Sequence, residues 1–344
     1  MDLAAALANH PRFPLLDGPT PIQRLTRIEQ ALGDAAQGIA LYAKRDDAPL
    51  VGGGGNKLRK LEYLLGAAIA DGADTFVTVG ARQSNHARLS AAAAARAGLT
   101  CELVLTRSVP REDVDYTDSG NILLDDLFGA TIHDLPGSVD SLAYAEARAE
   151  TLRRAGRKVH VAPSGGSSPL GCLGYAACAG EIVAQSAAMG IDFSHVIVPN
   201  GSAGTHAGLA AGYAALGRSP AVVTSFAVLA EESRSHQETV AKASATLALI
   251  DPAAAAIDPA DIDVNGSERG PGYGIPTFAM IEAVRMMARC EGLLLDPVYS
   301  GKAFAGLIAG IRAGDFAPGS TILYVMTGGT PGLFAYRGAL RAGA

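Results

Sequence analysis

Short apolar segments alternate with Ala-rich amphipathic segments through most of this 344-residue chain, and this alternation limits its fold more than any other feature. The apolar segments have the length of strands and the segments between them have the length of helices. We expect strands at residues 75–79, 101–105, 130–132, 159–162, 195–198 and 321–326. We expect helices at residues 85–97, 121–127, 143–155, 171–189 and 205–216. Such a pattern predicts an α/β fold of mostly parallel, twisted sheets flanked by helices.

The composition excludes several classes of protein. Hydrophobic residues make up 49% of the chain and charged residues 18%, which is enough apolar material for a large core. A net charge of −6, without any basic run or Trp, argues against a nucleic-acid partner. No apolar segment has the length of a membrane span, and residues 1–4 lack the basic start of a signal peptide. We therefore expect a cytoplasmic protein with no membrane partner.

The four cysteines show no spacing typical of a redox or metal site. We expect reduced thiols and no metal ligand at these positions, which are Cys101, Cys172, Cys178 and Cys290.

Four consecutive glycines, residues 52–55, lie just before Lys57, and apolar residues follow it. A loop lysine is usually a solvated surface charge, and the glycines alone could form a simple flexible turn. In a pocket that excludes water, a lysine amine loses its proton more readily and becomes a nucleophile. Lys57 is therefore a candidate for a Schiff base with an aldehyde.

A turn rich in Gly, Ser and Thr, residues 201–208, follows the expected strand 195–198. Backbone N–H groups between a strand and a helix can bind a phosphate, although the turn could also be only a tight connection. It lacks the Gly-Lys-Ser/Thr of a Walker loop and the G-x-G-x-x-G of a dinucleotide site, which disfavours a nucleotide-binding protein. Together with Lys57, the turn indicates a ligand with both an aldehyde and a phosphate, namely pyridoxal 5′-phosphate (PLP).

Residues 83–86, Gln-Ser-Asn-His, lie between an expected strand and an expected helix. Ser and Asn are common helix N-caps, and short donors at a helix N-terminus also suit a carboxylate. We expect both roles at this position, with His86 in a supporting position.

Taken together, these segments resemble the D-cysteine desulfhydrase and 1-aminocyclopropane-1-carboxylate (ACC) deaminase family of tryptophan-synthase-β-like PLP enzymes (fold type II). The resemblance runs from about residue 11 to residue 336. Its carriers are residues 19–21, 44–47, 55–62, 83–86, 201–205, 272–276, 296–299 and 327–329. It implies a homodimer whose larger, PLP-binding domain comprises residues 1–59 plus 169–344, with a smaller domain at residues 60–168.

The resemblance also implies cofactor-binding roles for particular residues. Lys57 would hold PLP covalently and later move the Cα proton. The ring hydroxyl would lie at Asn85 and the ring nitrogen at Thr327. Lys60 and a run of four backbone groups would bind the phosphate; the run is Ser202, Ala203, Gly204 and Thr205.

The same resemblance implies an amino-acid substrate next to the cofactor. Ser84 and Tyr299 would act in catalysis beside Lys57. The substrate would be surrounded by Gln83, Ser84, Asn85, Tyr273 and Tyr299.

Two positions bear on the reaction. ACC deaminases place a glutamate after the tyrosine that matches Tyr299, where this chain has Ser300, and a leucine where it has Thr327. Opening an unactivated cyclopropane needs more assistance than expelling sulfide or sulfite. We therefore expect α,β-elimination that yields pyruvate and ammonia, with D-cysteine as first choice of substrate, L-cysteate second and ACC third.

Arg82 departs from the uncharged residue expected in desulfhydrases. Pointing inward, it could bind a sulfonate, and residues 299–302 and 123–127 are also similar to L-cysteate sulfo-lyases. A surface arginine at a strand end is the simpler interpretation. The alternative outside enzymes is a PLP-binding regulatory protein, which the intact Lys57, Asn85 and Tyr299 disfavour.

Overall fold

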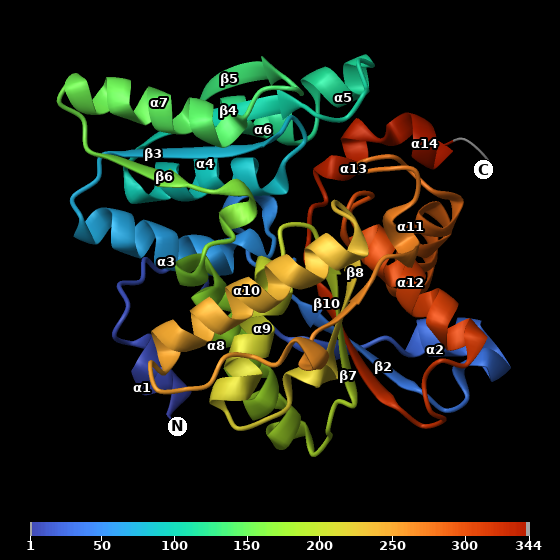
Figure 1. Cartoon of the computed structure of the whole chain (residues 1–344). Helices are drawn as coiled ribbons and strands as arrows, with labels where there is room; N and C mark the ends of the chain where they lie inside the picture. The colour runs from blue at the N-terminus through green and yellow to red at the C-terminus, as the bar shows by residue number, and fades with distance from the viewer. Residues whose placement is uncertain (1, 342–344) are drawn as a thin grey trace.

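The computed structural model describes residues 2–341, in which two sheets are flanked by helices (Figure 1). The larger sheet has six strands, in the order β1 (Ile22–Arg24), β2 (Ala40–Arg45), β10 (Thr321–Met326), β7 (His195–Asn200), β8 (Val223–Ala227) and β9 (Asp263–Asn265). In this sheet β1 pairs antiparallel with β2, and the other pairs are parallel. The predicted α/β fold of mostly parallel sheets is confirmed.

The smaller sheet has four parallel strands, in the order β5 (Thr131–Pro136), β4 (Thr100–Arg107), β3 (Thr75–Ala81) and β6 (Val159–Ala162). Alternate residues of β3 face opposite sides, as the period of a strand requires. Phe76 packs in a cluster with α3 (Lys57–Ala70) and α4 (Asn85–Ala97), whereas Val77 and Val79 pack with Ala145 of α7 (Ser141–Arg154). Both faces are therefore buried, which explains the continuous apolar strand sequences.

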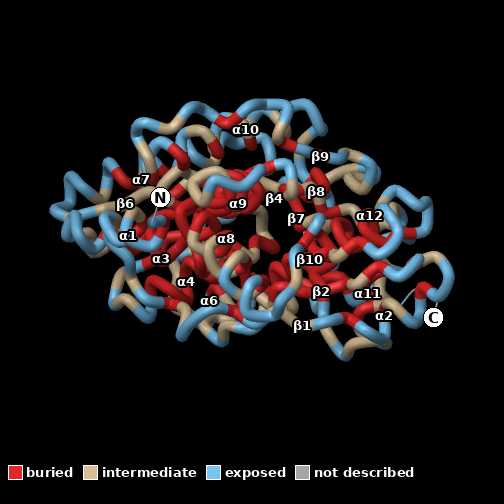
Figure 2. The backbone as a smooth tube through the Cα atoms, turned by 90° about the horizontal axis from the view of Figure 1, so that it is seen from below, coloured by how far each residue is buried: buried red, intermediate tan, exposed pale blue. Residues whose placement is uncertain are grey.

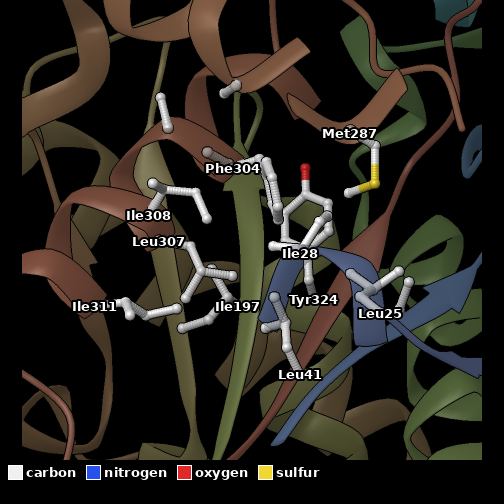
Figure 3. Packing of buried hydrophobic residues seen from close by; sticks show 14 of the residues in the cluster. Leu25, Ile28, Leu41, Ile197, Met287, Phe304, Leu307, Ile308, Ile311 and Tyr324 are labelled. Carbon is white, nitrogen blue, oxygen red and sulfur yellow. The ribbon is translucent and has the colours of Figure 1, made fainter. Parts of the chain in front are cut away.

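The larger sheet is likewise covered on both faces. On one face lie α2 (Thr26–Leu32), α11 (Phe278–Glu291) and α12 (Ser300–Ala313). Figure 3 shows Ile197 and Tyr324 of the sheet beside Phe304 and Leu307 of α12. The other face contacts α8 (Pro169–Met189) and α9 (Gly204–Ala215), which α10 (Glu232–Ile250) covers.

Helices α8 and α9 lie deep in the molecule, and much of their backbone is buried (Figure 2). Glycines let the neighbouring backbones approach closely. A Cβ at Gly174 of α8 would lie 2.1 Å from the Arg59 carbonyl oxygen of α3, and one at Gly208 of α9 would lie 2.3 Å from the Cys172 oxygen of α8. The backbone of α8 is therefore in direct contact with that of α3 and with that of α9.

Short helices complete the fold: α1 (Leu3–Leu7), α5 (Val114–Asp118), α6 (Asn121–Leu127), α13 (Gly332–Ala335) and α14 (Arg337–Arg341). The predicted bounds of α4, α6, β6 and β10 agree with the structure. One expectation was wrong: Lys57 is not in a loop but is the first residue of α3. Among residues 2–341, no helix combines the length and the apolar character that crossing a membrane requires.

Candidate active site

A cavity of about 320 Å³ is lined by residues that follow the carboxyl ends of β3, β7 and β10. Ligands of parallel α/β sheets bind at this edge. Ten of the predicted site residues line the cavity: Lys57, Ser84, Asn85, Ser202, Ala203, Gly204, Thr205, Tyr273, Tyr299 and Thr327. Lys60, Gln83 and Arg82 do not. The fold thus brings together segments that are up to 270 residues apart, from Lys57 to Thr327.

The glycine run lets the backbone pass close to other main-chain atoms just before Lys57. Gly54 has φ +77°, and a Cβ there would lie 2.3 Å from the Asp47 carbonyl oxygen. Gly55 forms a bridge with Gly328, so the Lys57 segment is tied to the end of β10. Burial lowers the pKa of Lys57 to about 8, so more of its amine is neutral and nucleophilic near neutral pH than in a solvated lysine.

Lys60 lies one turn further along α3 and is fully buried behind the turn that precedes α9. Its Nζ donates to Ser167 Oγ at 2.8 Å, and a Cβ at Gly204 would lie only 2.6 Å from that Nζ. Burial and the neighbouring Lys57 hold the pKa of Lys60 well below its usual range. An anion bound at Gly204 would oppose both effects and favour the ammonium form.

The turn at residues 202–205, where α9 begins, brings several backbone N–H groups together, and we call it the cradle. Ala203 has φ +67°, a left-handed conformation that is rare outside glycine and forms concave anion sites. Its N–H donates to Asn200 Oδ1 at 3.1 Å, and the Gly204 N–H donates to the Ser202 carbonyl. Of the four predicted phosphate-binding amides, those of Ser202 and Thr205 have no partner among the described residues. These two N–H groups, at the N-terminus of α9, suit an anion.

Ser84 and Asn85 lie at the N-terminus of α4, and the predicted helix cap is confirmed. Ser84 is the N-cap, since its Oγ accepts the Ala87 N–H at 3.1 Å, and it also lines the cavity. His86 lines the cavity too and bonds Thr78 Oγ1 through Nε2 at 2.8 Å. Burial lowers the pKa of His86, with Lys57 and Lys60 adding to the effect, so its ring is neutral.

Gln83, which was predicted to surround the substrate with Ser84 and Asn85, does not line the cavity. Its Nε2 donates to the carbonyl oxygens of Tyr116 and Ser119, and its Oε1 accepts the Asn121 N–H at 2.9 Å. All of these groups belong to the segment of α5 and α6. Gln83 therefore holds that segment in place instead of facing the cavity.

Arg82 also points away from the cavity. Its guanidinium forms two hydrogen bonds with Asp134 and one with Glu112. In this structure Arg82 therefore lies just after the end of β3 and pairs outward, and it does not point inward toward a sulfonate.

Tyr273 and Tyr299 both line the cavity, and their hydroxyl oxygens are hydrogen-bonded at 2.5 Å. Burial raises the pKa of both, so both carry their protons at neutral pH and one hydroxyl donates to the other. A Cβ at Gly201 would lie 2.8 Å from the Tyr299 ring, so glycine there leaves room for the tyrosine beside the cradle.

Ser300 does not line the cavity. It is buried, and its Oγ donates to Asp296 Oδ1 at 2.8 Å. The Asp296 carboxylate also accepts the N–H groups of Tyr299 and Ser300, so it caps α12 and fixes Tyr299. The Ser300 hydroxyl thus serves this helix cap, whereas Thr327 lines the cavity.

Comparisons with known proteins point to one enzyme family. The family described as pyridoxal-phosphate dependent enzyme matches residues 14–328. A D-cysteine desulfhydrase of Yersinia pestis is 42% identical over 98% of this chain and 99% of its own. An ACC deaminase of Burkholderia lata is 41% identical over the same shares. The crystal structure of an ACC deaminase homologue, 37% identical, superposes with a TM-score of 0.86 over 98% of both chains.

Proposed function

This chain belongs to the family of pyridoxal-phosphate-dependent enzymes that contains the D-cysteine desulfhydrases and ACC deaminases, and we propose that it eliminates sulfide from D-cysteine. The products are pyruvate, ammonia and hydrogen sulfide, with one water consumed. The observation that carries the proposal is a buried lysine of lowered pKa in one cavity with an anion cradle.

The residues present fit the cofactor. Lys57 supplies an amine for the aldehyde, and the free amides of Ser202 and Thr205 supply donors for the phosphate. Lys60 lies behind the cradle, where a bound phosphate would favour its ammonium form. Asn85 would hold the ring hydroxyl, and Thr327 would lie at the ring nitrogen. When bound, PLP withdraws electrons from the substrate Cα–H bond.

The chain's own residues then handle the protons. The substrate carboxylate is assigned to the N-terminus of α4, at Ser84 and Asn85, where the helix favours negative charge. Lys57, once released from the cofactor, takes the Cα proton. The protonated Tyr299 and Tyr273 pair lies beside the substrate and is suited to donate to the departing sulfur.

Two observations favour D-cysteine over the alternatives. Arg82 is fully engaged with two carboxylates, so a sulfonate has no free guanidinium there, which disfavours L-cysteate. Thr327 differs from the leucine of ACC deaminases, which disfavours ring opening. Sequence identities of 42% and 41% to the two kinds of relative do not choose between them.

A product assay tests this proposal. The protein is given D-cysteine, L-cysteine, L-cysteate and ACC separately, and pyruvate, sulfide, sulfite and 2-oxobutyrate are measured. We expect the highest kcat/KM for D-cysteine, with equal amounts of pyruvate and sulfide. Because Arg82 points away from the cavity, Arg82→Ala leaves this value close to that of the wild type. A much higher kcat/KM for L-cysteate, lost selectively in Arg82→Ala, would replace the proposal with a sulfo-lyase.

The pH dependence of cofactor attachment gives a second prediction. Only the neutral amine attacks an aldehyde, and burial lowers the pKa of Lys57 to about 8. The rate of PLP attachment to cofactor-free protein should therefore rise with pH and level off above about 8. Stopped-flow absorbance measures this rate. An inflection near the value of a free lysine, roughly 10.4, would show that burial does not activate Lys57.

The proposal keeps a two-domain division with a smaller domain at residues 60–168. Strands β3, β4, β5 and β6 all fall within that range, which supports it. A cytoplasmic homodimer is part of the same proposal, and four cysteines without a disulfide suit a reducing compartment. A regulatory PLP-binding protein would show the bound cofactor spectrum without product formation.

A further inference from the structure

Hydrogen bonds to its amide oxygen hold the Asn85 side chain in one orientation. Its Oδ1 accepts from Arg88 Nη1 at 3.3 Å and from Asn121 Nδ2 at 3.1 Å. Its Nδ2 lies on the opposite side, 3.5 Å from Asp296 Oδ2 and next to Gly329. Exchanging the amide oxygen and nitrogen would set N–H groups against two donors, so the network selects the orientation seen. One N–H of Asn85 Nδ2 is therefore directed at Asp296, and Asn85 itself lines the cavity, where its second N–H is available to a ligand.

Arg88 contributes the positive charge of this network. Its side chain is completely buried on α4. Nη1 also donates to Asn121 Oδ1 at 2.8 Å, and Nη2 donates to the Gly54 carbonyl at 2.8 Å, in the loop that leads to Lys57. Arg88 thus links the Asn85 segment of the smaller sheet to the Lys57 segment.

Arg88 has no carboxylate partner within ion-pair distance in the part of the chain that the structure describes. All of its acceptors there are neutral amide or carbonyl oxygens, and its Nε has none. A buried guanidinium normally pairs with a carboxylate, since an uncompensated charge is costly to bury.

The nearby acids compensate Arg88 only in part. Asp125 is buried without a hydrogen bond to either oxygen, and burial raises its pKa to about 8 despite the Arg88 charge. Burial likewise lowers the pKa of Arg88 to about 10, which still leaves it charged at neutral pH. The Arg88 charge therefore lies on the Oδ1 side of the Asn85 amide, and the Asp296 carboxylate, which also acts on Arg88, lies on the Nδ2 side.

We propose that Arg88 is a positioning residue for the cofactor: it fixes Asn85 with Nδ2 toward the cofactor's 3′-oxygen and favours the ionised form of that oxygen. A cation on the amide oxygen polarises the amide and strengthens its N–H as a donor. A stronger donor and a nearby positive charge both stabilise an anionic oxygen. The inference rests on the proposed function, because it assumes that the PLP ring hydroxyl lies at Asn85.

The test is the absorbance spectrum of protein saturated with PLP, at neutral pH and without substrate. Lysine-bound PLP absorbs at longer wavelength when the 3′-oxygen is ionised. Arg88→Gln should shift absorbance from the long-wavelength to the short-wavelength band and raise the PLP dissociation constant by roughly 10-fold. Arg88→Lys retains the charge and should recover most of the long-wavelength band.

Ser90→Ala is the matched control. Ser90 is buried on the same helix and its Oγ has no partner among residues 2–341, so its removal leaves the Asn85 network intact and the band ratio unchanged. If Arg88→Gln does not fold, Asn121→Ala removes the other donor to Asn85 Oδ1 without removing a charge. Because Asn121 Oδ1 also accepts from Arg88 Nη1, this variant loosens Arg88 as well and should lower the ratio of the long-wavelength to the short-wavelength band.

The outcomes separate this inference from the function on which it rests. A wild-type protein without any lysine-bound PLP band contradicts the proposed function. A wild-type protein with the band, but with an unchanged ratio in Arg88→Gln, or in Asn121→Ala where that variant replaces it, overturns the role of Arg88 alone.

Discussion

Lys57→Ala should leave a folded protein that neither retains PLP covalently nor forms product. The substitution removes both the amine that binds the aldehyde and the base that takes the Cα proton. A positioned general base alone contributes about 10²- to 10⁴-fold to a rate, so we expect kcat to fall by at least roughly 10³-fold. Pyruvate formation and the absorbance of dialysed protein measure the two losses separately.

Borohydride reduction of the wild-type protein identifies the lysine directly. After proteolysis, the pyridoxyl group should be found on the peptide that contains Lys57. Two other lysines with lowered pKa values provide the internal comparison: Lys60 behind the cradle and Lys302, whose pKa burial lowers to about 8. A label on either of them would refute the assignment, whatever the activity of Lys57→Ala.

Asp46→Ala should be the most destabilising of the substitutions considered for the region beneath the site. Asp46 follows β2 and is buried, and its carboxylate accepts four hydrogen bonds. Two are charge-assisted and come from Nε and Nη2 of Arg59. The other two come from Thr20 Oγ1 at 2.8 Å and from the Tyr175 hydroxyl of α8 at 2.6 Å.

Removing one partner of a buried pair leaves an uncompensated charge, so the free energy of unfolding should fall by about 3–5 kcal/mol. Urea denaturation followed by circular dichroism gives this value. Tyr175→Phe removes a single hydrogen bond to the same carboxylate and should lower it by only about 1–3 kcal/mol. Equal losses in the two variants would mean that Glu181, which also pairs with Arg59, suffices to compensate the guanidinium.

The sequence predicted the segments whose burial follows a simple period. Strands β6 and β10 and helices α4 and α6 have the expected bounds because apolar runs and small-residue stops mark them. The start of α3 was misjudged at Lys57, since a glycine run normally signals a loop and Asn56 makes no side-chain cap. Here the bridge between Gly55 and Gly328 fixes the backbone instead, and no local signal reports such a distant contact.

Sequence motifs identified many of the residues that line the cavity. They did not show which way each side chain points, and that direction decides whether a residue reaches the cavity. Gln83 and Ser84 are neighbours in sequence, yet Ser84 lines the cavity and Gln83 points into the α5–α6 segment. Arg82 turns outward because Asp134, at the end of another strand, supplies its partner. Arg88 and Asp296 were not singled out, although Arg88 follows the Ser-Asn-His motif by two residues and Asp296 opens the motif of Tyr299.

The backbone contacts along α3, α8 and α9 have a consequence for redesign of this protein. Because these contacts join backbone atoms, they set the spacing between the Lys57 segment and the cradle whichever side chains line the cavity. Specificity at Tyr273 or Thr327 can therefore be varied over a rigid frame. A single methyl at Gly174 or Gly208, neither of which lines the cavity, would instead force that frame apart. The site thus depends on positions that contribute no chemical group, and a library aimed at new substrates should leave them untouched.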